Sequence, residues 1–542
     1  MRLIQNKWLL SISTAFLLIV AWPRGGFAPL LLVAFIPFFF LDEQLLKSEK
    51  KRPSWRAFRW GYFTFFLWNI ITTWWIWNST PFGAIMAILL NTLFQSFVYM
   101  AYFATRRALK MRSYGLLLFP LFWIAFEWWH MNWDLSWPWL NLGNGFGAYP
   151  KMIQWYEFTG ILGGSLWVLL VNILAFFIIK GVHSEVFNVK DRILHIVSFV
   201  LVLIIPLTLS YVIFSTYQEK GSPIEVVVVQ PNHDPWTEQY GMPQSEILKH
   251  VLDLGASKAD TATRYIVYPE STLYDDIWVD RIDSTPAILT IKNFLKAYPQ
   301  TSVVIGSSTY EYYGKEKKTE TARTFTDRKE YYDAYNTAIC IDTIHPCSYY
   351  HKSKLVPGPE KLPFPSLLRP LQDVAFNLGG TVGSLGLMKE RKALGAPFQK
   401  VKTGVAICYE SIYGEFVAGY IKNGAGLLFV ITNDGWWGNT AGHRQHLVFS
   451  SLRAIETRRD VARSANTGIS AFINQKGEIT EETPYWQEAV IKKTLHANNE
   501  VTFYVQYGDY LGRIAAYASV LLFLGGRVQR VIKKKDLRDL NS

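Results

Sequence analysis

The feature that most constrains this chain is a series of apolar segments crowded into its N-terminal part. Seven of them occupy residues 8–22, 27–45, 60–77, 82–104, 114–129, 160–179 and 193–213. Most approach the roughly 20 residues that a helix needs to cross the hydrocarbon core of a bilayer. An eighth candidate, residues 511–531, follows a long polar interval and contains Arg513. The pattern predicts a polytopic α-helical membrane domain with about eight transmembrane helices.

Basic residues between these segments predict the orientation of the helices, because Lys and Arg near helix ends are retained on the cytoplasmic side. They gather in alternate loops and in the tail, at residues 46–59, 105–113, 180–192 and 527–538. Eight spans with both termini in the cytoplasm place residues 215–510 outside it. This topology accounts for the net charge of +12, so the composition gives no reason to expect a nucleic-acid partner. The first segment lacks a small-x-small cleavage site and is predicted to remain as an uncleaved helix.

Tryptophans mark the predicted outer ends of the spans, where an apolar ring can lie in the headgroup zone with its N–H hydrated. They include Trp22, Trp74, Trp75, Trp77, Trp128, Trp129, Trp133, Trp137 and Trp139. Glu127, near the outer end of the fifth segment, is an ionisable group in an apolar setting. The sequence leaves open whether it is a snorkelling or paired carboxylate or part of a substrate cavity.

The residue pattern changes near Gly221, from long apolar segments to short runs of β-branched residues separated by turns. Strands are predicted at residues 224–230, 264–268, 301–305, 337–341, 403–407 and 426–431, and helices at 245–255, 287–297 and 445–459. This alternation is typical of a layered α/β domain, and about 300 residues suffice for a full core. The charged segment 311–334 is predicted to be an exposed hairpin extension or a mobile loop, with a role in solvation. We expect a membrane domain over residues 1–220, an extracytoplasmic domain over 221–510, and a C-terminal helix with a basic tail over 511–542.

Three polar residues, Glu270, Lys352 and Cys408, stand at the C-terminal ends of predicted strands. A rigid α/β scaffold presents side chains for chemistry at such positions. A cysteine nucleophile needs a base to take its proton, and a neighbouring cation lowers the thiol pKa and can stabilise an oxyanion. Taken singly, a cysteine after an apolar strand is more often a small buried hydrophobe, and a lone Glu or Lys is usually solvated.

The order and context of these residues resemble the nitrilase superfamily of carbon–nitrogen hydrolases, over about residues 222–510. The motifs are Tyr-Pro-Glu-Ser at Glu270, Tyr-x-Lys-x-x-Leu-Val-Pro at Lys352 and Ile-Cys-Tyr-Glu at Cys408. The resemblance implies an αββα sandwich that carries a Glu-Lys-Cys triad. In that triad Glu270 would be the general base, Lys352 would stabilise the oxyanion and Cys408 would be the nucleophile.

The same resemblance implies roles for five further residues. Glu360 falls where the superfamily has a second glutamate that supports the lysine, although the loop departs from the usual Pro-Phe-Gly-Glu pattern. Tyr409 and Glu410 follow the nucleophile as that pattern expects. Trp436 lies in an Asn-Asp-x-Trp loop, and Trp236 lies near the position of a superfamily tryptophan. Hydrophobic packing or membrane contact would explain the two tryptophans about as well as a role in the site.

The complete architecture is similar to the membrane-embedded lipoprotein N-acyltransferase family of Gram-negative bacteria. That similarity implies transfer of a fatty acyl chain from a phospholipid, through a thioester on Cys408, to the N-terminal amine of the diacylglyceryl-cysteine of an apolipoprotein. It further implies a monomer in the inner membrane that needs no cofactor. The catalytic domain would lie on the periplasmic side, with both termini in the cytoplasm.

Two alternatives stay open on the sequence. A membrane-tethered amidase would use the same triad with water as acceptor, and a lipid-handling or transport protein would use the outer domain only for binding. No His-Glu-x-x-His spacing occurs, and His443 and His446 are expected at the surface or at a helix start, so no metal is predicted. Cys340 and Cys347 can form a disulfide without being required to, and this would leave Cys408 free.

Overall fold

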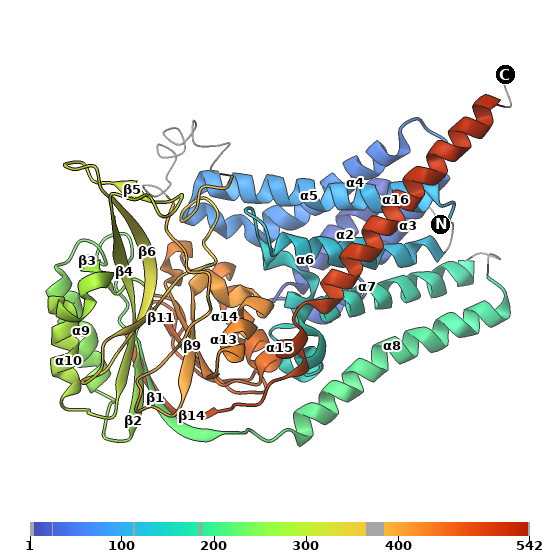
Figure 1. Cartoon of the computed structure of the whole chain (residues 1–542). Coiled ribbons are helices and arrows are strands. Elements are labelled where there is room, and N and C mark those ends of the chain that lie inside the picture. The colour runs from blue at the N-terminus through green and yellow to red at the C-terminus, as the bar shows by residue number, and fades with distance from the viewer. Residues whose placement is uncertain (1–4, 24, 112–113, 184–186, 365–383, 540–542) are drawn as a thin grey trace. The chain divides into compact units, whose positions relative to one another are not determined.

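The computed structural model describes residues 5–23, 25–111, 114–183, 187–364 and 384–539 of the 542-residue chain (Figure 1). The chain divides into two compact units. Unit 1 comprises Met1–Trp74, Ala84–Ser215 and Asp509–Ser542, and unit 2 comprises Trp75–Gly83 and Thr216–Gly508. Unit 1 is helical, and unit 2 holds the β-sheets.

The long apolar helices belong to unit 1. Its helices are α2 (Lys7–Ala21), α3 (Ile36–Lys47), α4 (Pro53–Thr73), α5 (Pro81–Ala108), α6 (Phe119–His130), α7 (Tyr156–His183), α8 (Val189–Thr216) and α16 (Tyr510–Asp539). Five helical segments of the described chain are long and apolar enough to cross a membrane: Ala28–Lys47, Pro81–Ala108, Tyr156–Val182, Val189–Thr216 and Tyr510–Lys533. Three predicted spans are not among these five. α2 and α6 have only 15 and 12 residues, and the span predicted at 60–77 is divided between α4, which ends at Thr73, and the 3-10 helix η2 (Trp74–Asn78).

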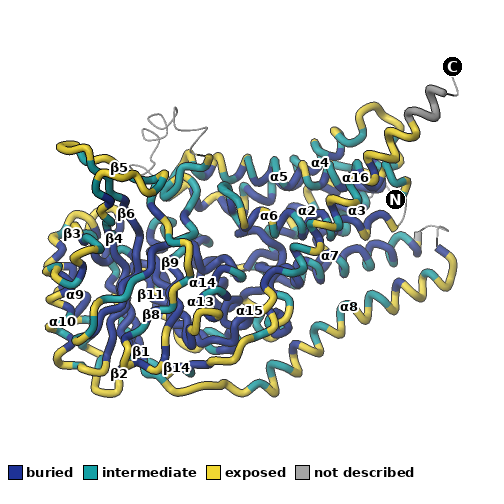
Figure 2. Tube along the Cα trace, viewed as in Figure 1, coloured by how far each residue is buried: buried dark blue, intermediate teal, exposed yellow. Residues whose placement is uncertain are grey.

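Helix α8 exposes most of its apolar side chains (Figure 2). Of its residues, His195 and Ser210 are buried, whereas Ile205 and Tyr211 are more than half exposed. A contiguous apolar face of this length is unfavourable in water. It is the surface expected of a helix that contacts lipid chains.

A buried charge cluster ties three helices of unit 1 together. Arg106 on α5 forms ion pairs with Asp42 and Glu43 on α3, at 2.6 Å in the case of Glu43. Lys180 on α7 reaches the other oxygen of Glu43 at 2.9 Å. The sequence predicts Arg106 as a loop cation, but α5 continues to Ala108 and the side chain is fully buried. The cluster tolerates burial because each charge has an opposite partner.

Glu127 on α6 accepts hydrogen bonds from three donors. Trp123 Nε1 donates to its Oε1 at 2.9 Å, and the N–H of Leu142 donates to the same oxygen at 2.8 Å. Ser165 Oγ on α7 donates to Oε2 at 2.5 Å. Both carboxylate oxygens are therefore used inside unit 1. This arrangement favours the interpretation of Glu127 as a paired structural carboxylate.

Unit 2 contains two β-sheets. The first has eight strands in the order β14-β1-β2-β4-β6-β5, with β3 paired to β4 and β7 paired to β6. The second has six strands in the order β13-β12-β11-β10-β9-β8. The strands are β1 (Ser222–Gln230), β2 (Thr263–Val267), β3 (Leu273–Trp278), β4 (Ser302–Gly314), β5 (Arg323–Thr324), β6 (Tyr331–Ile341), β7 (Ser348–His351), β8 (Ala393–Leu394), β9 (Lys402–Ile407), β10 (Ala425–Thr432), β11 (Val461–Ala465), β12 (Ala471–Ile473), β13 (Ile479–Glu482) and β14 (Ala489–Ala497).

The two sheets face each other, and helices cover their outer faces (Figure 1). The covering helices are α9 (Gln244–Ala256) and α10 (Pro286–Leu295) on the first sheet, and α13 (Gly414–Lys422) and α14 (Ala441–Thr457) on the second. Between the sheets, the rings of Tyr265 and Phe429 lie 5.3 Å apart, and Ser464 Oγ donates to the Val229 carbonyl at 2.8 Å. Every residue of β10 is buried, as expected for a strand covered on both faces. This αββα sandwich confirms the predicted fold class.

The predicted solvating hairpin, residues 311–334, contains an aromatic cluster. β4 and β6 pair at its base, from Glu311↔Asp333 to Gly314↔Tyr331, and β5 pairs with the same end of β6. The rings of Phe325 and Tyr332 lie 4.6 Å apart, Trp278 stacks on Phe325 at 5.9 Å, and the Arg328 guanidinium lies 4.1 Å from the Phe325 ring. The charged residues of this segment therefore lie around a cluster of aromatic rings. The sequence did not indicate this cluster, because charged residues dominate the segment.

Candidate active site

The three predicted triad residues follow strands from both sheets of unit 2. Glu270 comes three residues after the end of β2, and Lys352 directly follows β7 in the same sheet. Cys408 directly follows β9 in the second sheet. A short 3-10 turn, η9 (Cys408–Ile412), begins at the cysteine. Both layers of the sandwich thus supply the candidate site.

Lys352 lies between two carboxylates. Its Nζ is 3.0 Å from Glu270 Oε1 and 2.7 Å from Glu360 Oε1, and the side chain is 1% exposed. Asn336 on β6 donates from Nδ2 to Glu270 Oε1 at 2.7 Å. The N–H of Val356 donates to Glu360 Oε2 at 2.8 Å, which fixes the second glutamate. These contacts hold the Lys352 ammonium and the Glu270 carboxylate in one defined geometry.

Cys408 occupies a left-handed backbone conformation, with φ of 52°. A non-glycine residue in this region is strained and persists only where its surroundings hold it. The residue is partly exposed, whereas its chain neighbours Ile407 and Tyr409 are buried. The turn from β9 into η9 therefore places Cys408 at the C-terminal end of its strand, at the edge of the second sheet.

Burial is the main influence on the Cys408 thiol, and it favours the protonated form. Burial raises the pKa of the Cys408 thiol well above 9, and the Glu270 charge adds to this effect, while the Lys352 charge opposes it. Burial lowers the pKa of Lys352, but Glu270 and Glu360 outweigh it and hold that pKa well above 10.5. The Lys352 charge therefore acts on the thiol in the direction that the sequence predicts, but burial and the Glu270 charge outweigh it. A base must then take the thiol proton during attack.

Glu410 joins the loop of the nucleophile to the loop of the lysine. Its Oε1 accepts from the N–H of Ser353 at 2.6 Å and from Tyr350 Oη at 2.7 Å. Its Oε2 accepts from the N–H of Ile407 at 2.9 Å. Glu410 is fully buried, and both of its carboxylate oxygens accept hydrogen bonds from the protein. The side chain therefore positions the two loops and is not available to contact substrate.

The predicted aromatic residues separate into two groups. Tyr409 is buried, and its ring lies 5.3 Å from that of Tyr413. Trp236 and Trp436 form an edge-to-face pair with ring centroids 4.8 Å apart, and Trp236 is 58% exposed. The structure brings the two tryptophans together in one partly exposed contact, although they are 200 positions apart in sequence.

Two polar residues at this site are missed by sequence reasoning. Asn336 is the hydrogen-bond partner of Glu270, and its signal is an amide inside the largely buried strand β6. His446 was expected at the surface or at a helix start; its side chain is instead fully buried in the second turn of α14, whereas His443 lies in the first turn, as one of the two alternatives predicted. His443 is also buried, with its ring stacked 3.8 Å from that of Tyr485.

The described residues include all three cysteines, and each is a free thiol. Cys340 is buried, and burial raises its pKa to about 12. Cys347 is partly exposed, and burial likewise raises its pKa. Neither thiol has a lysine held between two carboxylates beside it, so the setting of Cys408 is distinct among the three.

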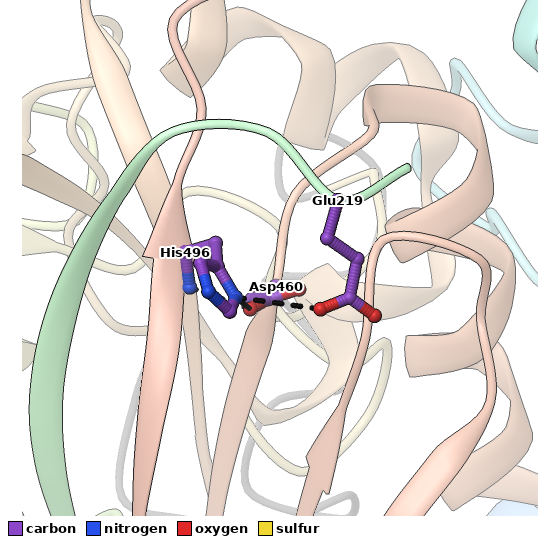
Figure 3. A group of neighbouring side chains, drawn as sticks. All are labelled: Glu219, Asp460 and His496. Atoms are coloured by element: carbon purple, nitrogen blue, oxygen red, sulfur yellow. Dashed lines mark hydrogen bonds and ion pairs between the residues drawn. The ribbon is translucent and has the colours of Figure 1, made fainter. Parts of the chain in front are cut away.

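A second group of chemically active side chains lies elsewhere in unit 2, at Glu219, Asp460 and His496 (Figure 3). One potential metal-ligand atom from each lies within 4.8 Å of the others. His496 Nδ1 is 3.3 Å from Glu219 Oε2 and 3.7 Å from Asp460 Oδ2. The backbone N–H of His496 also donates to that Asp460 oxygen, at 2.7 Å. The His496 imidazole thus lies between two carboxyl groups of the same chain, and we assign the group no metal.

Replacement of Asp460 by Asn should stabilise the protein at pH 8 and change little at pH 4. Burial raises the pKa of Asp460 from 3.8 to about 6, against the hydrogen bond from His496. The folded state therefore disfavours the ionised carboxylate, and stability is lost as the pH rises through 6. Asn should recover about 2–3 kcal/mol at pH 8, which the thermal midpoints of the two proteins at both pH values will measure.

Asp260→Asn is the control of opposite sign, because the hydrogen bond from Lys492 lowers the pKa of that exposed carboxylate. Its substitution should destabilise the protein slightly at pH 8. Equal stabilisation by Asp460→Asn at pH 4 and pH 8 would show that proton binding at Asp460 is not the cause.

Comparison with known proteins places this site in a family. The model of the carbon–nitrogen hydrolase family matches residues 226–500, so the chain belongs to that family. The model of the apolipoprotein N-acyltransferase N-terminal domain matches residues 14–174. Over 542 residues the chain is 28% identical to the apolipoprotein N-acyltransferase of Chlorobaculum tepidum, with 98% of each chain covered.

A second relative and a solved structure extend this comparison. The chain is 27% identical over 534 residues to the apolipoprotein N-acyltransferase of Geobacter metallireducens, covering 93% of this chain and 92% of that one. An amidase from Nesterenkonia sp. is 16% identical with a TM-score of 0.36, covering 55% of this chain and 99% of the amidase. The resemblance to membrane-embedded lipoprotein N-acyltransferases is confirmed along the chain, and the amidase and transport alternatives are not favoured.

Proposed function

We propose that this protein transfers a fatty acyl chain from a phospholipid to the N-terminal amine of the diacylglyceryl-cysteine of an apolipoprotein, through a thioester on Cys408. The observation that carries this proposal is the Lys352 ammonium held between Glu270 and Glu360, next to the left-handed turn at Cys408. The apolar helices support lipid substrates, because both acyl donor and acceptor are anchored in a bilayer.

In the first half-reaction, the Cys408 sulfur attacks the ester carbonyl of the phospholipid while its proton passes to Glu270. The carbonyl oxygen becomes an oxyanion, which the Lys352 ammonium stabilises. Collapse of this intermediate breaks the ester C–O bond. Glu270 returns the proton to the leaving oxygen, so that a lysophospholipid departs and the acyl chain remains on sulfur as a thioester.

In the second half-reaction, the α-amine of the apolipoprotein attacks the thioester carbonyl. Glu270 takes a proton from the attacking nitrogen, and Lys352 again stabilises the oxyanion. Collapse breaks the C–S bond and forms the amide, and the sulfur recovers its proton from Glu270. The partly exposed pair of Trp236 and Trp436 offers apolar ring surface that is suited to contact an acyl chain or lipid anchor.

The proposal also includes the cellular location of the protein and its oligomeric state. Residues 1–220 and 511–542 would lie in and beside the bacterial inner membrane, with both termini in the cytoplasm, and residues 221–510 would face the periplasm. We propose a monomer, because one chain supplies all three reactive residues. No cofactor is needed, since Glu270 carries each proton and Lys352 supplies the positive charge.

Incubation of the purified full-length protein with phospholipid should add one acyl chain to Cys408. Mass spectrometry of the intact protein and of its peptides locates the adduct, and a synthetic diacylglyceryl lipopeptide should then discharge it as an N-acylated product. Discharge follows because the amine replaces the thiol on the acyl carbonyl.

Two variants control this measurement. Cys408→Ala should acquire no adduct, while the double variant Cys340→Ala/Cys347→Ala should acquire it normally, because those two thiols are outside the site. An adduct that persists in Cys408→Ala would refute the acyl-enzyme. Loss of the adduct to water, with no acylation of the lipopeptide, would instead support an amidase-type hydrolase.

A further inference from the structure

A fully buried line of polar side chains lies behind the nucleophile turn and takes no part in the proton transfers above. Asp434 follows β10, His446 lies on α14 and Ser411 lies in η9, and none of the three has exposed surface. His446 Nδ1 is 2.9 Å from Asp434 Oδ1. On the other side of the ring, His446 Nε2 is 3.0 Å from Ser411 Oγ.

This line ends on the backbone of the nucleophile. Ser411 Oγ donates to the carbonyl oxygen of Cys408 at 2.8 Å, and His446 Nε2 lies 3.2 Å from the same oxygen. The Ser411 hydroxyl has one proton, and it donates that proton to the Cys408 carbonyl. Ser411 Oγ can then only accept from His446. The Nε2 atom of His446 therefore carries a proton, which it donates to both Ser411 Oγ and the Cys408 oxygen. The imidazole and the hydroxyl therefore hold one carbonyl together.

The far end of the line is anchored by a buried cation. Arg463 Nη2 donates to Asp434 Oδ2, and Thr432 Oγ1 donates to Asp434 Oδ1 at 2.8 Å. Burial raises the pKa of Asp434, but the charges of Arg463 and His446 outweigh it and hold that pKa below its usual range. The carboxylate stays ionised and fixes the orientation of the His446 ring.

The carbonyl held in this way belongs to the peptide unit between Cys408 and Tyr409. This peptide bond is trans, so its C=O and its N–H point in opposite directions. Donors on the carbonyl oxygen therefore also set where the Tyr409 N–H points, which is away from α14. Such a constraint is needed here because the left-handed conformation of Cys408 is strained.

We propose, on the basis of the proposed acyl transfer, that His446 is a positioning residue that aims the Tyr409 N–H at the oxyanion. It acts through the Cys408 carbonyl, with Asp434 and Arg463 fixing its ring. The Tyr409 N–H then complements the Lys352 ammonium at the oxygen that becomes negative in both half-reactions. A donor stabilises an oxyanion only when it is aimed in advance at the position of that oxygen.

Two substitutions of His446 separate this role from simple packing. In Gln the amide nitrogen can occupy the place of Nε2 and keep a donor toward Ser411 and the Cys408 carbonyl, whereas Asn reaches only the place of Nδ1. In the full-length protein, acylation of Cys408 is measured with phospholipid and with a p-nitrophenyl ester. Alkylation by iodoacetamide serves as the reference, because it forms no oxyanion.

His446→Asn should slow acylation by about 10²-fold while leaving alkylation nearly unchanged, and His446→Gln should recover most of the acylation rate. His443→Asn, one turn earlier on α14 and also buried, should leave the ratio of acylation to alkylation unchanged. An equal fall of both reactions in His446→Asn, or a Gln variant as slow as the Asn variant, would overturn the positioning role. Acylation of the wild type by the ester but not by phospholipid would refute the proposed donor, and the ester would still decide the role of His446.

Discussion

Replacement of Lys352 by Met should strongly slow acylation of Cys408 and destabilise the protein at the same time. The ammonium lies 3.0 Å from Glu270 and 2.7 Å from Glu360, so its loss leaves two carboxylates facing each other in a largely buried site. Removal of one partner from a buried ion pair costs about 3–5 kcal/mol. Loss of the oxyanion cation should lower the acylation rate by at least about 10²-fold. Adduct formation and the thermal midpoint of the full-length protein measure the two effects.

A triple variant separates these two effects of Lys352. Lys352→Met/Glu270→Gln/Glu360→Gln carries no buried charge at the three positions, so it should recover much of the lost stability and remain inactive. If the triple variant is as unstable as Lys352→Met, carboxylate repulsion is not the cause. Acylation of Lys352→Met at the wild-type rate would remove Lys352 from the proposed machinery.

Replacement of Glu270 by Gln should slow acylation by about 10²–10⁴-fold, the usual contribution of a general base. Burial and the Glu270 charge hold the pKa of the Cys408 thiol well above 9, so thiolate is scarce at neutral pH. Loss of the Glu270 charge removes one cause of the raised thiol pKa. Burial, the larger cause, remains and keeps the thiol pKa raised. The residual rate should therefore follow the thiolate fraction and rise about tenfold per pH unit between pH 7 and pH 9, more steeply than in the wild type.

The initial rate of adduct formation across that pH range tests the role of Glu270. Glu316→Gln, in the charged hairpin, is the matched control and should behave as the wild type. A residual rate in Glu270→Gln that is independent of pH would show that thiol deprotonation does not limit the reaction. An unchanged rate would exclude Glu270 as the base.

Much of unit 2 could be predicted from the sequence because its local patterns are simple. The helix predicted at residues 245–255 is α9 (Gln244–Ala256), and the strand predicted at 224–230 is β1 (Ser222–Gln230). β14 (Ala489–Ala497), the antiparallel partner of β1, could not be recognised because its Lys492 and Lys493 interrupt the apolar pattern. Its identity as a strand depends on pairing with a segment far away in the sequence.

The candidate site was predictable where the residue type itself signals chemistry, as at Glu270, Lys352 and Cys408. The buried polar network behind them was not predictable, because burial of a polar group depends on partners that are distant in sequence. His446 can be buried because both of its ring nitrogens have hydrogen-bond partners, Asp434 at Nδ1 and Ser411 at Nε2. Arg106 in unit 1 is a similar case, since its partner Asp42 lies 64 positions earlier.

The bond pattern of Glu410 has a consequence for engineering this enzyme. One buried carboxylate accepts from the backbone at Ser353, beside the lysine, and at Ile407, beside the cysteine. The two loops are therefore mechanically coupled, and a displacement of one strains the other. A chimera that imports only the lysine loop or only the cysteine loop from a relative should misalign its reactive atoms, so a graft must exchange both loops together.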